Sequence, residues 1–104
     1  MTILPDVPEG WSCYLLVCSD DSYYCGIAAD LASRIRHHAS GKGSGYTKKV
    51  KPVALIWFES HPNRRSAAAR EKQIKSWSHQ KKRALAEGGR EFEGLGIRMM
   101  VSLG

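Results

Sequence analysis

The stretch YYCGIAADLASRIRHH (residues 23–38) predicts a strand followed directly by a helix. Two tyrosines and an isoleucine near its start are typical of a strand. Asp30 is a common helix N-cap, because its side-chain oxygen accepts a hydrogen bond from the free backbone N–H groups of the first turn. We therefore expect the helix to begin at Leu31 and to end near Ala39.

The inward face of this expected helix is unusually polar. Leu31, Ile35 and His38 have the i, i+4, i+7 spacing of one helical stripe, and Arg34 lies at its edge. One interpretation is a half-buried histidine with satisfied hydrogen bonds beside an Arg34 that pairs with an acid. The other is a polar functional site, and the helix alone does not decide between them.

A second strand precedes this segment. WSCYLLVCS (residues 11–19) is short and almost entirely apolar, which predicts a strand buried on both faces, followed by a hairpin turn at SDDS. A two-residue loop would place Val17 opposite Tyr24, whereas a three-residue loop would place Leu16 there and bring Tyr14 and Tyr24 to one face. Because Asp-Asp lacks the glycine that tight two-residue turns favour, we expect the longer loop.

The remaining chain predicts one more strand and two more helices. VALIWFES (residues 53–60) is another continuous apolar run with strand residues. Asn63 or Ser66 can cap a helix that ends near Lys75, and a further helix is expected over about His79–Glu87. The predicted order is β-β-α-β-α-α, an α+β fold. The C-terminal stretch REFEGLGIRMMVSLG is either an added strand or a docked tail.

Length and composition indicate one domain. The chain has 104 residues, of which 42% are hydrophobic and 25% charged, and this suits a single compact core. We assign residues 1–10 to an N-terminal lead-in, 11–87 to the folded domain and 88–104 to a C-terminal tail of unknown role. The apolar runs are too short to cross a bilayer and the first ten residues lack a secretory signal pattern, so we expect a cytoplasmic protein without membrane contact. Three cysteines spaced C-x4-C-x6-C favour neither a disulfide framework nor a zinc site.

The net charge of +6 comes from basic blocks in the sequence. Every charged residue from Arg34 to Lys51 is basic, and Glu71 is the single acid between Arg64 and Arg83. Such blocks suit a polyanion such as nucleic acid. The alternative is a solvated basic surface that keeps the protein soluble.

Glu71 is an unexpected acid on an inward stripe. Ala67, Glu71 and Ile74 have the i, i+4, i+7 spacing of residues that should contact the sheet. A carboxylate buried there requires an arginine, several hydrogen-bond donors or a divalent cation. Alternatively, Glu71 leans outward and pairs with Lys75 at i+4.

The candidate residues resemble the set that phosphodiester hydrolysis needs: they are two tyrosines, an arginine, a histidine and an inward glutamate. A guanidinium can hold the non-bridging oxygens, a carboxylate can bind Mg2+ or Mn2+, and a phenol or imidazole can orient or deprotonate water. The order SCY (12–14), YCG (24–26), Arg34, His38 and Glu71 resembles the GIY-YIG nuclease superfamily, in particular its small single-domain bacterial branch. The resemblance covers about residues 11–87.

The resemblance implies a three-stranded antiparallel sheet flanked by helices, with the site on one face of the sheet. Glu71 would bind one divalent cation, Mg2+ or Mn2+, and Arg34 would hold the scissile phosphate. Tyr24, with Tyr14 or His38 as alternatives, would activate or orient the attacking water, while a metal-bound water would protonate the leaving oxygen. The implied site residues are Tyr14, Tyr24, Arg34, His38 and Glu71, with Gly26 as the motif glycine.

The sequence departs from the family pattern in three respects. Ser12 and Cys13 replace the Gly-Ile of the first motif and Cys25 replaces the Ile of the second, and these are packing positions. Ile27 stands where some relatives have a lysine that supports the tyrosine, which affects the assignment of the base. No additional DNA-reading domain is expected, so loops would set specificity. The expected contacts with backbone phosphates are Arg36, Lys42, Lys48, Lys49 and Lys51.

The sequence thus predicts a metal-dependent endonuclease that hydrolyses phosphodiester bonds in DNA, with structured or single-stranded nucleic acid as alternative substrates and DNA repair or recombination as the setting. We expect no small-molecule cofactor, and a monomer or weak homodimer. The alternatives are a non-catalytic nucleic-acid-binding module with the same fold, and a small adaptor whose partner supplies catalysis. Retention of the whole residue set favours the enzyme, because an inward carboxylate would repel phosphate in a pure binding module.

Overall fold

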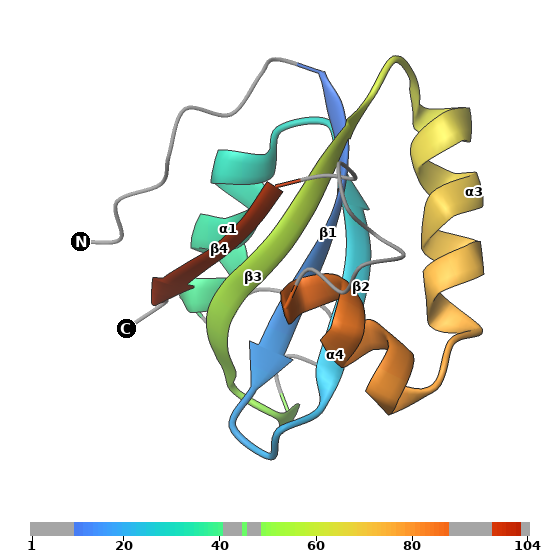
Figure 1. The fold of residues 1–104 in the computed structure, drawn as a ribbon. Coiled ribbons are helices and arrows are strands. Elements are labelled where there is room, and N and C mark those ends of the chain that lie inside the picture. Colours follow the sequence, from blue (N-terminus) through green and yellow to red (C-terminus); the bar gives the residue numbers. More distant parts are fainter. Residues whose placement is uncertain (1–9, 41–44, 46–48, 88–96, 103–104) are drawn as a thin grey trace.

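The computed structural model describes residues 10–40, 45, 49–87 and 97–102, and for 97–102 it describes the backbone alone. The elements, in chain order, are β1 (Trp11–Cys18), β2 (Tyr23–Ala28), α1 (Leu31–Ala39), β3 (Pro52–His61), α3 (Arg64–Lys75), α4 (His79–Glu87) and β4 (Ile97–Ser102). The α+β class and the predicted order β-β-α-β-α-α are confirmed (Figure 1). Nearly all of the N-terminal lead-in, and the expected phosphate contacts Lys42 and Lys48, lie outside the described residues.

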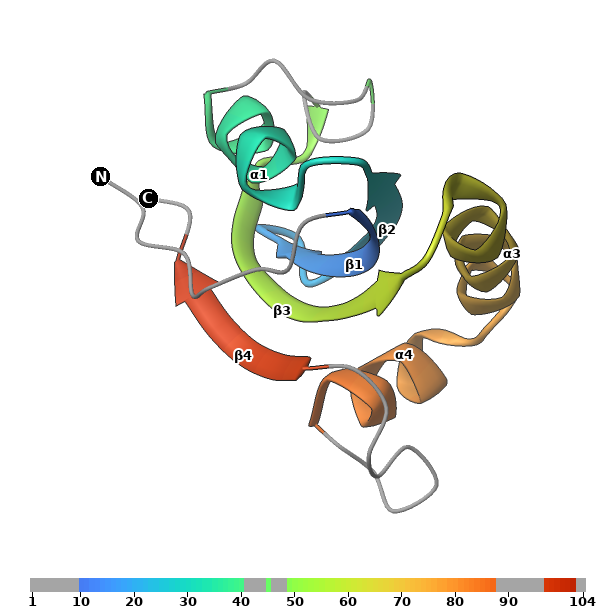
Figure 2. The same ribbon diagram turned by 90° about the horizontal axis from the view of Figure 1, so that it is seen from above.

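The sheet is antiparallel, with the strand order β2-β1-β3-β4. The predicted three-stranded sheet is confirmed as β2-β1-β3, with β1 in its centre. β4 extends this sheet by pairing with β3, so the C-terminal stretch contributes a strand. Figure 2 shows α1 on one face of the sheet, and α3 and α4 toward the other. In the described part of the chain, no helix has the length and apolar character needed to cross a membrane.

The β1–β2 hairpin has the predicted three-residue loop, because Leu16 pairs with Tyr24. The Asp21 N–H donates to the Cys18 carbonyl at 2.9 Å, and the Cys18 N–H donates to the Ser22 carbonyl at 2.8 Å. Asp21 has a φ of 67°, in the left-handed region, and this combination is typical of a type I turn closed by one left-handed residue. The register brings Tyr14 and Tyr24 to the same face of the sheet.

Each face of the sheet has its own hydrophobic core, because side chains alternate along β1. The α1 face contains Tyr14, Leu16, Ala28, Leu31, Ile35, Leu55 and Phe58. The other face, beneath α3 and α4, contains Cys13, Leu15, Cys25, Ala54, Ile56, Trp57, Ile74 and Leu85. The register of β3 shifts between Leu55 and Trp57, so that Leu55 and Trp57 belong to opposite cores. All three cysteines are buried free thiols, and contact with Cys25 raises the pKa of the Cys13 thiol.

The helices begin at the predicted caps. The Asp30 carboxylate accepts a hydrogen bond from the Ser33 N–H at 3.1 Å. Of the two candidate caps for α3, Asn63 is the one used, and its side chain accepts from the Ser66 N–H at 2.8 Å. The resulting orientation of α1 buries His38 almost completely, at 1% exposure.

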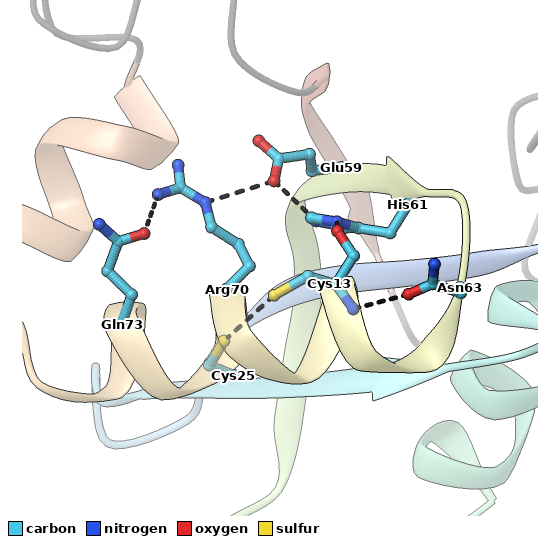
Figure 3. A network of polar contacts seen from close by, with 8 residues as sticks. Cys13, Cys25, Glu59, His61, Asn63, Arg70 and Gln73 are labelled. Carbon is cyan, nitrogen blue, oxygen red and sulfur yellow. Dashed lines mark hydrogen bonds and ion pairs between the residues drawn. The ribbon is translucent and has the colours of Figure 1, made fainter.

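A polar network fastens the first half of α3 to the end of β3 (Figure 3). The two ring nitrogens of His61 lie 2.8 Å from Glu59 Oε1 and 2.6 Å from Ser66 Oγ. Arg70 Nε lies 3.3 Å from the same Glu59 oxygen. These four residues, Glu59, His61, Ser66 and Arg70, are called the Glu59 network below.

Candidate active site

Four of the five predicted catalytic residues form one cluster on the α1 face of the sheet. The hydroxyl of Tyr14, on β1, lies 2.8 Å from His38 Nε2, on α1. Tyr24, on β2, has its ring centroid 6.3 Å from that of Tyr14 and 5.2 Å from that of His38. The Arg34 guanidinium donates hydrogen bonds to both phenol oxygens. Tyr14, Tyr24, Arg34 and His38 are called the tyrosine cluster below.

Gly26 is required by the position of the Tyr14 ring. Tyr14 and Gly26 are paired residues of β1 and β2, and the ring lies across the glycine. A Cβ added to Gly26 would be 2.6 Å from the Tyr14 hydroxyl oxygen and 2.7 Å from its Cζ, closer than any side chain tolerates. The motif glycine therefore makes room for the fully buried Tyr14 ring.

His38 is an uncharged member of the cluster at neutral pH. Burial, together with the nearby Arg34 and His37, lowers its pKa to about 4. The neutral imidazole can accept a hydrogen bond at one ring nitrogen. Because the Tyr14 oxygen already accepts from Arg34, the Tyr14 proton is available to His38 Nε2.

Arg34 carries the positive charge of the cluster. Its hydrogen bonds to the phenols of Tyr14 and Tyr24 raise the pKa of the guanidinium, so it stays protonated. Burial raises the pKa of Tyr14, which therefore remains a neutral phenol at neutral pH. A guanidinium has five N–H donors, so donors remain for an anionic ligand after both tyrosines are satisfied.

Glu71 is not joined to the tyrosine cluster by a hydrogen bond or ion pair between described residues. It lies on α3, and its Oε2 is 3.6 Å from Lys75 Nζ, the pairing that the sequence offered as the alternative to an inward carboxylate. Its neighbours on the inward stripe, Ala67 and Ile74, are fully buried as predicted, whereas the Glu71 side chain is 24% exposed. Figure 2 shows β2 between α1 and α3, so the helices of Arg34 and Glu71 flank the same edge strand.

A divalent cation fits Glu71 only if the substrate also holds it. The described residues contain no group of three His, Cys, Asp or Glu side chains that could hold a metal ion. Mg2+, however, commonly keeps several waters and binds one or two carboxylates together with substrate phosphates. The competing Lys75 side chain is 54% exposed, and an exposed i, i+4 pair is worth only about 0.5 kcal/mol. Glu71 is thus a partly exposed, weakly paired carboxylate that could serve as one ligand of such a shared ion.

The described basic residues expected to contact phosphates are exposed. Arg36 lies on α1, two residues after Arg34, and Lys49 and Lys51 lie before β3. Their side chains make no hydrogen bond or ion pair with a described residue. They are available for an anionic ligand.

A family model described as the GIY-YIG catalytic domain matches residues 10–84. The chain belongs to the GIY-YIG family. Membership implies a nuclease-type function with nucleic acid as the substrate class, and GIY-YIG nucleases are generally metal dependent. The matched range contains all four residues of the tyrosine cluster, with Tyr14 and Tyr24 on adjacent strands.

Proteins similar to this chain include several named UPF0213. A relative from Haloquadratum walsbyi is 42% identical over 79 residues, which cover 76% of this chain and 89% of the relative. A relative from Staphylococcus epidermidis is 37% identical over 76 residues, covering 73% and 93% of the two chains. The solution NMR structure of a UPF0213 protein from Bacillus halodurans has 36% sequence identity and a TM-score of 0.49, and covers 79% of this chain and 89% of that one.

The Glu59 network could not be predicted from the sequence. This network positions α3, the helix that carries Glu71. Glu59 and His61 are two residues apart on one strand, so they share a face, and Arg70 directly precedes Glu71. Two titratable residues at this spacing, at the end of an apolar strand, were the sequence feature that indicated a polar network. It does not reveal their partners, because those come from a helix whose docking angle depends on the whole core.

Proposed function

We propose that this chain is a metal-dependent endonuclease that hydrolyses phosphodiester bonds in DNA. The observation that carries the proposal is the tyrosine cluster, in which one guanidinium is held between two phenols beside a neutral imidazole. A site built only for packing would not assemble a permanent cation with two phenols on one face of a sheet. The family match over most of the chain gives independent support.

In the proposed reaction, Arg34 binds the non-bridging oxygens of the scissile phosphate. Its remaining N–H donors face a negative charge that grows in the transition state, so the contact strengthens as the reaction proceeds. Hydrogen bonds to Tyr14 and Tyr24 fix the orientation of the guanidinium before substrate arrives.

Tyr24 is the group that we assign to the attacking water. It is partly exposed, whereas Tyr14 is fully buried, so of the two phenols Tyr24 can be reached by water. Tyr14 then acts as a positioning residue that contacts Arg34 and His38 at once. His38 accepts at Nε2 and thereby keeps the Tyr14 oxygen turned toward Arg34.

Glu71 is the residue that would hold the divalent cation, Mg2+ or Mn2+, which when bound supplies charge neutralisation at the phosphate and the leaving oxygen. The carboxylate must leave Lys75 to do so, a small cost for an exposed pair. Arg36, Lys49 and Lys51 contact backbone phosphates next to the cleaved one, a mode of binding that does not depend on base sequence. No small-molecule cofactor is part of this mechanism, and a monomer or weak homodimer suffices for it.

The proposal is tested with purified protein on supercoiled plasmid and on branched and single-stranded oligonucleotides, each with Mg2+, Mn2+ or EDTA. We expect cleavage with either metal and none in EDTA. Glu71→Gln, Arg34→Lys and Tyr24→Phe should each slow cleavage by about a hundredfold or more, because each removes a group that acts on the reacting atoms. Arg83→Gln, an exposed charge on α4, is the matched control and should retain activity.

Two results would count against this function. Cleavage that survives in both the Glu71 and Arg34 variants would mean that another site, or a contaminant, is responsible. Binding of nucleic acid that is unaffected by metal, with no cleavage of any substrate, would favour the non-catalytic binding module.

A further inference from the structure

One flank of helix α3 makes contacts within the protein. Ala67 and Ile74 are fully buried against the sheet. On one side of them, Ser66 and Arg70 belong to the Glu59 network, and Arg70 also lies over the ring of Trp77, at 5.3 Å from its centroid. These contacts fix the rotation of the helix about its own axis.

The other flank of α3 begins at Glu71 and becomes basic toward solvent. Successive residues on a helix are rotated by about 100°. Glu71 is therefore followed around the helix by Arg64 and Lys75, and then by Lys72 and Arg65 on the outermost surface. All four cations lie on the same side of the inward stripe as Glu71, and the Glu59 network lies on the opposite side.

Two of these cations have no partner within the described part of the chain. Arg64 lies over the ring of Trp11, with its Cζ 5.9 Å from the centroid, and Lys75 pairs with Glu71. Arg65 and Lys72 are exposed and make no hydrogen bond or ion pair with a described residue. They are seven residues apart, which is about 10 Å along the helix axis.

Only a small side chain lies between Arg65 and Lys72 on the helix surface. Ala69 occupies the intervening position on the same stripe, and it is exposed. An alanine there lets a bulky ligand approach the helix between the two long side chains. The result is a pair of free cations with an open surface between them, on the outer face of the helix that carries Glu71.

We propose that Arg65, Ala69 and Lys72 form a second phosphate-binding surface that holds the backbone of duplex nucleic acid across α3. This inference rests on the proposed function and specifies its substrate class. Arg36 belongs to a basic surface on α1 and the proposed surface lies on α3, and Figure 2 shows these two helices on either side of β2. A duplex has two phosphate backbones and can engage both surfaces at once.

The composition of this surface favours a duplex over a single strand. Proteins that hold single strands combine basic grooves with aromatic side chains on which the bases stack. Every tryptophan, tyrosine and phenylalanine that the structure describes is buried or half-buried, and none is exposed near Arg65 or Lys72. Phosphate contacts without base stacking are sufficient for a duplex, whose bases are already stacked on each other.

The test measures binding in EDTA, without relying on cleavage. Fluorescence anisotropy gives the affinity for a blunt duplex and for one of its single strands at several salt concentrations. The double variant Arg65→Gln, Lys72→Gln should bind the duplex more weakly, and the magnitude of its log–log salt slope should fall by about 1.8, since each lost phosphate contact removes about 0.9. Its affinity for the single strand should fall less. Lys81→Gln with Arg83→Gln, which removes the same charge from exposed positions on α4, should leave the duplex slope unchanged.

Four other outcomes would each overturn the inference. An unchanged duplex slope in the α3 double variant, an equal loss in the α4 control, or an equal loss for the single strand would show that this flank is not a duplex-binding surface. Wild-type protein that binds no duplex in EDTA would overturn it as well. Because cleavage is not measured, a protein that binds as expected but cuts nothing would contradict only the endonuclease proposal.

Discussion

Gly26 lies at the closest contact within the tyrosine cluster, where its missing side chain determines what the Tyr14 ring can do. The ring is fully buried and its hydroxyl is held by His38 and Arg34, so it cannot move aside without breaking those contacts. Gly26→Ala should therefore lower the free energy of unfolding by about 1–3 kcal/mol and strongly reduce cleavage, because overpacking displaces the ring. Chemical denaturation and plasmid cleavage measure the two effects.

Gly45→Ala is the matched control for this change, since a Cβ at Gly45 would meet nothing within 4 Å. It should leave stability unchanged or raise it by up to about 1 kcal/mol. A Gly26→Ala protein as stable and active as the Gly45→Ala protein would show that the Tyr14 ring is not confined by the glycine.

His38 should make the stability of the protein depend on pH. Its pKa in the folded protein is about 4, below the ordinary value of 6.5. Between these values the unfolded chain binds a proton that the folded protein does not, so the free energy of unfolding falls as the pH drops from 6.5 to 4. The total loss from this residue is about 3 kcal/mol. Urea denaturation at a series of pH values should show a shallower acid dependence for His38→Gln than for the wild type.

His37 provides the control for the pH experiment. It is the exposed neighbour of His38 on α1 and the smallest of the three causes of the low His38 pKa, so His37→Gln should retain most of the wild-type pH dependence, which burial maintains. If His37→Gln and His38→Gln flatten the profile equally, the buried imidazole is not the titrating group.

At the scale of the elements, Arg70 determines how α3 is attached. Its guanidinium is half-buried, ion-paired with Glu59 at 3.3 Å and placed over the rings of Trp57 and Trp77. Arg70→Ala should lower the free energy of unfolding by about 2–4 kcal/mol, because Glu59 loses its partner and the tryptophans lose packing. Lys72→Ala, on the exposed side of the same helix, should change it by less than about 0.5 kcal/mol. Equal effects in urea denaturation would mean that the network does not anchor the helix.

The same elements show which features could be read from the sequence. The limits of α1 and the register of the β1–β2 hairpin depend on residues that are near one another in the chain, such as Asp30 and the Asp-Asp turn, so they could be predicted. The pairing of β4 with β3 could not, because a short apolar run has the same pattern whether it forms a strand or docks as a tail. The register shift next to Trp57 is likewise a property of two strands together.

The candidate site was also predictable where it depends on local spacing, and not where it depends on contacts across the fold. The inward position of His38 follows from helical spacing, and the shared face of Tyr14 and Tyr24 follows from the hairpin loop. The contact of Tyr14 with Gly26 and the pairing of Glu71 with Lys75 depend on distances across the assembled sheet and on side-chain rotamers. Helical spacing placed Glu71 near the inward stripe, but it did not determine which residue would form an ion pair with its carboxylate.

At the scale of the whole molecule, the proposed site has two separate parts, and the substrate must contact both of them. Arg34 and the tyrosines lie on the α1 face, and Glu71 lies on the helix beyond β2. Neither half is a complete metal site, because a single carboxylate is a weak ligand for Mg2+ or Mn2+ in water. Phosphate oxygens would supply the additional ligands, so metal and nucleic acid should each strengthen the binding of the other.

This coupling can be measured with Mn2+, whose binding is followed by electron paramagnetic resonance. We expect free protein to bind Mn2+ weakly, and its complex with a non-cleavable phosphodiester duplex to bind at least about tenfold more tightly, equivalent to a coupling free energy of about 1.4 kcal/mol. Duplex alone is measured in parallel, because phosphates bind Mn2+ without protein. Glu71→Gln should abolish the gain over the sum of protein and duplex, whereas Glu87→Gln, an exposed carboxylate on α4, should retain it. Tight binding of Mn2+ to the free protein, or coupling that persists in Glu71→Gln, would place the metal at a different position and separate Glu71 from the reaction.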